Sequence, residues 1–139
     1  MIELDNRTTL EVDEPLLNKI AKTLTDKEIE LIITNNAEIT EINYNHRNIN
    51  KPTDVLSFPY ETMPMTPLGS IVISQEFIQE KSSELGHSNS NEMTLLFIHG
   101  LLHLLGFDHE VDNGEMRKKE EEMIIKFQLP TSLIVRTQG

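Results

Sequence analysis

Hydrophobic and polar residues alternate along this chain with two different periods. Residues 13–15 read Asp-Glu-Pro, which is typical of a helix start, and apolar residues at helical spacing follow from 16 to 24. IELIIT at 29–34 is a short β-branched run bounded by two asparagines, and it predicts a strand. IELDN at 2–6 alternates weakly and predicts an edge strand.

The same patterns continue to the end of the chain. AEITEINYNHR (37–47) predicts a second helix, and DVLSFP (54–59) and SIVIS (70–74) predict two further strands. Ser74 is positioned to cap a third helix that Gly86 ends, and two more helices are expected at about 91–105 and 112–128. The order of elements favours an α/β fold (α+β mixed), with a small mixed four-stranded sheet covered by about five helices.

Length, composition and charge narrow the class of protein. With 139 residues, 37% of them hydrophobic, the chain fits a single domain spanning 1–139. It has no cysteine, no basic and apolar leader, and no run of 18 uncharged apolar residues, so we expect a cytoplasmic protein without a membrane role. The net charge of −11 opposes general attraction to nucleic acid. Any binding of nucleic acid must therefore depend on a local site, and no DNA binding is expected.

The segment HGLLHLLGFDH (99–109) contains the most specific chemistry. His99 and His103 are four residues apart and would lie on one face of a helix. Gly106 falls where a left-handed residue can end the helix and turn His109 towards the same point. Three neutral imidazoles favour Zn²⁺ and leave a fourth position for water, as in catalytic zinc sites. The spacing therefore predicts one zinc ion per chain at a helix C-terminus.

This spacing is also that of metzincin proteases, in which a glutamate follows the first histidine. Here that position is Gly100, which cannot take a proton from water. The protease interpretation therefore lacks its general base.

The chain resembles the YbeY family of bacterial metal-dependent endoribonucleases. The resemblance rests on HGLLHLLGFDH together with INYNHRNINKPTDVLSFP (42–59), LGSIVI (68–73), Met116 and Glu120. It implies zinc held by His99, His103 and His109, cleavage of single-stranded RNA, and a role in 16S rRNA 3′-end maturation and ribosome quality control. It also implies the small ribosomal subunit or its assembly proteins as partners, and Arg47 as a residue of the catalytic cleft. The chain departs from the family at Ser70, where the family often has aspartate.

The distribution of charge agrees with the position of Arg47. Residues 52–80 and 82–116 contain no lysine or arginine, whereas 43–53 contains Arg47, Lys51 and His46 and no acid. If this segment faces the metal, Arg47 can hold a phosphate at two points. By itself the segment also fits a solvated helix end.

Other residues have simpler interpretations. His46 and His87 fit surface positions, Tyr44 fits a partly buried tyrosine, and Lys118 to Glu122 fit a solvated helix face, although Glu120 could orient a ligand imidazole. Asp108 and Glu110 flank His109 and are weaker candidates. Two alternatives to the RNA nuclease remain: a zinc hydrolase of peptides or other small substrates, and a non-catalytic ribosome assembly factor with structural zinc.

Overall fold

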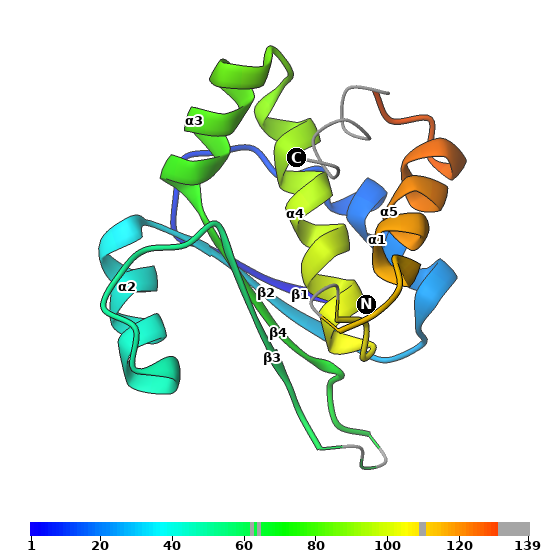
Figure 1. Ribbon diagram of the computed structural model, residues 1–139, viewed down its shortest axis with the longest axis horizontal. Helices are drawn as coiled ribbons and strands as arrows, with labels where there is room; N and C mark the ends of the chain where they lie inside the picture. Colours follow the sequence, from blue (N-terminus) through cyan, green and yellow to red (C-terminus); the bar gives the residue numbers. More distant parts are fainter. Residues whose placement is uncertain (62, 64, 109–110, 131–139) are drawn as a thin grey trace.

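The computed structural model describes residues 1–61, 63, 65–108 and 111–130 of the chain. Within this part the chain forms four strands and five helices (Figure 1). In chain order these are β1 (Ile2–Asn6), α1 (Glu14–Leu24), β2 (Ile29–Thr34), α2 (Asn36–Arg47), β3 (Val55–Pro59), β4 (Gly69–Ser74), α3 (Gln75–Leu85), α4 (Asn89–Leu104) and α5 (Glu115–Lys126).

The strands form one mixed sheet in the order β1-β2-β4-β3, which confirms the predicted fold class. β1, β2 and β4 run parallel, while β3 runs antiparallel to β4 and pairs Val55 with Ile73. β3 is therefore an edge strand, as is β1 at the opposite side. Every residue of β4 is buried, because it is a central strand with both faces covered.

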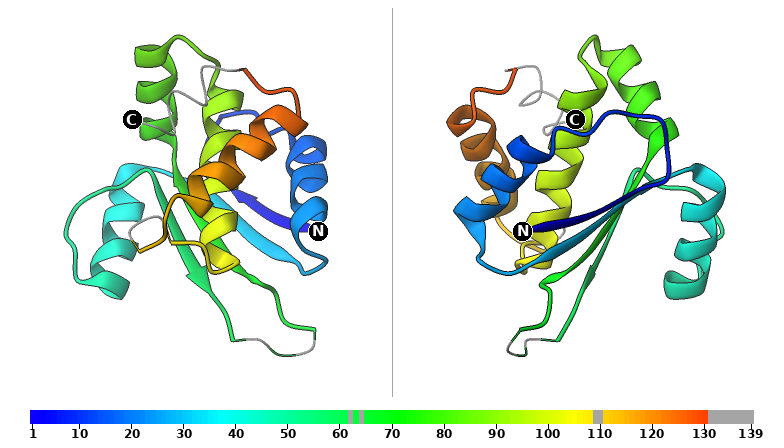
Figure 2. Two further views of the ribbon diagram at one scale, coloured as in Figure 1. Left: turned by 45° about the vertical axis from the view of Figure 1, so that its right-hand side comes forward. Right: turned by 180° about the vertical axis from the view of Figure 1, so that it is seen from behind.

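The helices are divided unequally between the two faces of the sheet. Figures 1 and 2 show α1, α4 and α5 on one face and α2 on the other. The α4 face holds the main hydrophobic core, in which Ile71 and Ile73 pack with residues of α1, α4 and α5. On the α2 face a smaller cluster consists of Ile39, Leu56 and Val72. α2 is thus attached to the sheet through a core of its own.

Local capping explains where α3 begins and ends. Ser74 caps α3 by accepting a hydrogen bond from the Phe77 amide at 3.3 Å, and Gly86 ends that helix with φ of 73°, both as predicted. α5 begins three residues later than predicted. Gly114 (φ 99°) donates to Asp112 at 2.9 Å in a turn before the helix.

The described part of the chain contains no helix long and apolar enough to cross a lipid bilayer. The longest, α4, has 16 residues and packs across the sheet through the main core.

Candidate active site

His99 and His103 lie one turn apart in the last part of α4, with the Nε2 atoms of their rings 3.1 Å apart. The ring planes are nearly perpendicular, at 78°. α4 ends as predicted: Gly106 takes φ of 99°, and its amide donates to the carbonyl of His103 at 3.0 Å. The third predicted ligand, His109, lies outside the described residues, as does Glu110. The three-histidine site therefore stays a prediction.

The two rings are oriented through their other nitrogens. His99 Nδ1 lies 3.0 Å from a carboxylate oxygen of Glu120, and His103 Nδ1 lies 3.0 Å from the carbonyl oxygen of Phe107. Because these oxygens accept, each Nδ1 carries the proton and each Nε2 presents a lone pair. Two nitrogens bound to one tetrahedral zinc at 2.0–2.1 Å would be about 3.3 Å apart. The donor set and its spacing thus fit a zinc ion.

Glu120 is the site residue that sequence patterning placed on a solvated face. In the structure Glu120 is buried on α5, with a side chain only 7% exposed, directly against His99. A carboxylate behind a ligand imidazole fixes the tautomer and raises the basicity of the ring. Lys118 and Glu122 in the same charged run are exposed, as expected for a solvated helix face. Glu120 departs from that expectation because α5 packs on α4 at this position.

A pocket of about 410 Å³ is lined by the two histidines and also by Arg47. Its walls come from the C-terminal end of α2, the outer edge of β3, and the C-terminal end of α4. Arg47 is the only lysine or arginine among its described lining residues. The lining residues are Arg47, Asp54, Val55, Leu56, Ser57, Pro59, His99, His103 and Asp108.

Gly100 is a point of close contact between α4 and the strands β3 and β4. The Ser57 hydroxyl donates to the Gly100 carbonyl at 3.1 Å. A Cβ at position 100 would lie 2.9 Å from Ile71 Cγ2 and 3.2 Å from Ser57 Oγ. A glutamate at this position would therefore require the side chains of Ile71 and Ser57 to shift. Ser57 itself was missed in the sequence, where a serine inside an apolar strand gives no signal of a pocket.

Ser70 lies on β4 and is buried. The hydrogen bond to Glu30 raises the pKa of the neighbouring Tyr60 above its usual value, and a hydrogen bond with Ser70 acts in the opposite direction. The Tyr60 hydroxyl donates to Glu30 at 2.6 Å. Ser70 is not among the described lining residues of the pocket.

The surface interpretation is right for His46 and wrong for His87. His46 is exposed at the end of α2. The His87 side chain is 3% exposed, and its Nε2 lies 2.8 Å from the buried carboxylate of Glu92. His87 is buried because the tight turn between α3 and α4 folds it back onto α4. Tyr44 is 48% exposed rather than partly buried.

Within the described residues no group of three histidine or acidic side chains that could hold a metal is gathered. The structure does place His99, His103 and Arg47 in the lining of one pocket.

Comparison with known proteins identifies the family. A family model described as Endoribonuclease YbeY matches residues 2–128. The chain is 60% identical over 139 residues to Endoribonuclease YbeY of Sulfurimonas denitrificans, covering 100% of both chains. It is 64% identical to that of Aliarcobacter butzleri, covering 98% of this chain and 99% of the relative. A solution structure of a Thermotoga maritima protein matches with a TM-score of 0.63 and 28% identity, over 91% of this chain and 89% of that one. The chain belongs to the YbeY family.

Proposed function

We propose that this chain is a zinc-dependent endoribonuclease that cleaves single-stranded RNA during 16S rRNA 3′-end maturation and ribosome quality control. One observation carries the proposal: Arg47 lines the same pocket as His99 and His103, although it comes from the opposite face of the sheet. The relatives from Sulfurimonas denitrificans and Aliarcobacter butzleri, both called Endoribonuclease YbeY, support RNA as the substrate.

The residues that would hold the zinc ion are His99, His103 and His109. When bound, zinc would supply Lewis acidity towards a phosphate oxygen and lower the pKa of a water molecule. Glu120 and the Phe107 carbonyl keep the two described imidazoles in the tautomer that leaves Nε2 as the ligand atom.

Arg47 acts on the phosphate itself. Its planar guanidinium offers paired donors that match two phosphate oxygens, and it remains charged at every physiological pH. In a pocket that contains Asp54 and Asp108, this one cation places the phosphate and stabilises charge that develops on it during cleavage.

The cellular partners follow from the same charge pattern. A protein of net charge −11, with a single lysine or arginine among the described residues of its pocket, makes few contacts to RNA, so it needs a partner that brings the RNA end to the cleft. The small ribosomal subunit or its assembly proteins would do this, in the cytoplasm. Neither DNA nor a membrane is a proposed partner.

The test compares labelled single-stranded RNA, single-stranded DNA and casein, each incubated with protein of verified metal content. We expect cleavage of RNA alone, one zinc per chain, loss of cleavage on chelation, and loss of zinc in His103→Ala. Metal-dependent cleavage of casein would favour the peptide hydrolase. Full zinc content without any cleavage would favour an assembly factor with structural zinc.

A further inference from the structure

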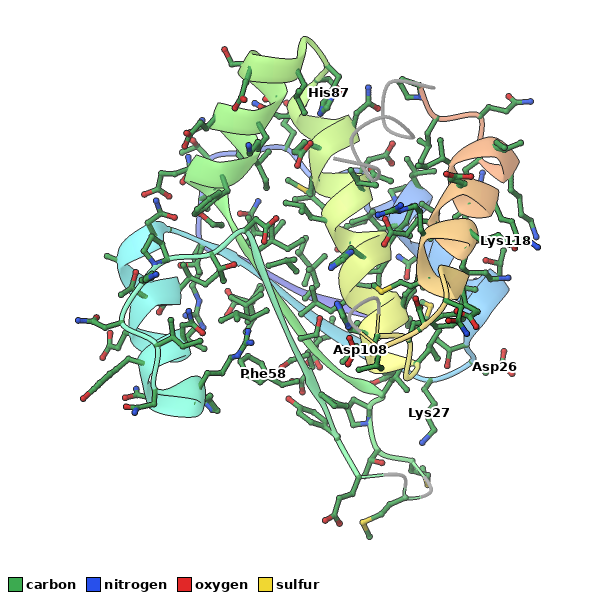
Figure 3. All side chains as sticks on the ribbon, in the orientation of Figure 1. Asp26, Lys27, Phe58, His87, Asp108 and Lys118 are labelled. Carbon is green, nitrogen blue, oxygen red and sulfur yellow. The ribbon has the colours of Figure 1, made fainter. Side chains whose placement is uncertain are left out.

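A pair of aromatic rings lies next to Arg47 and has no part in the mechanism above. The imidazole of His46 and the ring of Phe58 have centroids 4.9 Å apart and planes tilted by 45°. Figure 3 shows Phe58 on β3 beside the C-terminal end of α2, where His46 lies. We call these two residues the His46–Phe58 ring pair.

Both rings are held in place. His46 Nδ1 lies 3.0 Å from the carbonyl oxygen of Ile42, one turn back along α2, so this nitrogen donates and the ring is fixed against its own helix. Phe58 packs against the small cluster of Ile39, Leu56 and Val72. His46 nevertheless remains exposed, so an ordered ring is open to solvent. A ring that is already ordered loses little conformational entropy when a ligand stacks on it.

The segment that carries His46 has a charge that suits a polyanion. Residues 43–53 contain no acid in a chain that has 23 acidic residues. The next residue after His46 is Arg47, which faces the pocket of His99 and His103. A flat ring beside a phosphate-binding arginine is the combination by which proteins bind single-stranded nucleic acid, because bases stack on rings while cations hold the backbone.

We propose that the His46–Phe58 ring pair is a nucleobase subsite, which stacks one unpaired base of the RNA whose phosphate contacts Arg47. The inference rests on the proposed ribonuclease function and deepens it by giving a physical cause for single-strand preference. A base inside a duplex is stacked on both sides, so it cannot reach His46 without leaving its helix.

The first experiment measures binding of a 2′-O-methyl hexanucleotide, which resists cleavage, by fluorescence anisotropy at verified zinc content. His46→Ala is expected to weaken binding about 5- to 100-fold, as for loss of one stacked base. His46→Phe keeps a ring and should remain within about threefold of the parent protein. The matched control is Tyr44→Ala: Tyr44 is 48% exposed on the same helix, but two residues from His46, and so about 200° around the helix axis. It should bind normally.

The second experiment places a single abasic nucleotide at each position of the hexamer in turn. One position should weaken binding to the parent protein, and the same position should have no effect on His46→Ala. Equal binding by the parent protein and His46→Ala would overturn the subsite, whatever the outcome of the cleavage assays. Absence of cleavage of ordinary RNA, with base-dependent binding intact, would instead overturn the ribonuclease function and leave the subsite standing.

Discussion

The carboxylate of Glu120 on α5 lies 3.0 Å from Nδ1 of His99 on α4, and it joins the two helices at the proposed zinc site. We predict that Glu120→Gln lowers zinc affinity about 10- to 100-fold, because an amide neither fixes the tautomer nor raises the basicity of His99 as a carboxylate does. Competition with a chromophoric chelator measures this. The control is Glu122→Gln, an exposed residue of the same helix. Equal affinities for both variants would remove Glu120 from the site.

Arg47→Ala should lower kcat by about 100-fold or more, because it removes the donor that we propose stabilises charge in the transition state. Zinc content and thermal stability should stay within error of the parent protein, since Arg47 is exposed at the end of α2. Lys51→Ala is the control: it also removes one positive charge from this segment, but Lys51 is not among the described lining residues of the pocket. This variant should cleave a short RNA normally. Normal turnover by Arg47→Ala would show that the residue has no catalytic role.

Gly69→Ala should destabilise the fold by about 2–3 kcal/mol, which urea unfolding measures. A Cβ at this position would lie 2.5 Å from the carbonyl oxygen of Phe58 and 2.7 Å from Leu104 Cδ2, and the backbone of a paired strand cannot move away. Gly100→Ala should cost less, because the neighbours of its Cβ are side chains that can shift and because alanine favours the helix. The opposite order of the two variants would contradict this account.

Stability should fall in acid partly through Glu38. A hydrogen bond from Thr34, and a second from Arg7, hold the pKa of Glu38 below its ordinary value of 4.5. The carboxylate therefore stabilises the fold above about pH 4.5, and this contribution is lost as the pH falls through the lower pKa of the folded state. Glu38→Gln should flatten the dependence of urea midpoint on pH below 4.5. Glu41→Gln, an exposed change on the same helix, should keep the full slope.

Binding of single-stranded RNA by the free protein should be weak and only slightly sensitive to salt. Arg47 is the single basic residue among the described pocket residues, and each phosphate contact on a single strand contributes about −0.7 to the slope of log K against log salt. We expect a slope between 0 and about −2 for the 2′-O-methyl hexanucleotide. A steeper slope would indicate a larger cationic surface and would remove the need for a targeting partner.

Patterns within one element were enough to predict much of this fold. β2 spans Ile29–Thr34 as the β-branched run indicated, and Ser74 and Gly86 bound α3 because capping depends on neighbours in sequence. The pairing of His99 and His103 followed in the same way from helical spacing.

Residues whose role depends on contacts between elements were harder to predict from the sequence. Glu120 and His87 looked solvated because their sequence neighbours are polar, and only the packing of α5 and of the α3–α4 turn against α4 buries them. Ser57 contacts Gly100 across 43 positions of sequence, a relationship that no local pattern contains.

The two walls of the pocket rest on separate hydrophobic cores on opposite faces of one sheet. The histidine wall belongs to the main core, whereas the Arg47 wall is supported by the cluster of Ile39, Leu56 and Val72. Substitutions in the small cluster are therefore expected to act first on α2, because α4 and α5 pack through the main core. A change in the Arg47 wall could thus alter the proposed RNA-binding side of the pocket while His99 and His103, the proposed metal ligands, keep their packing.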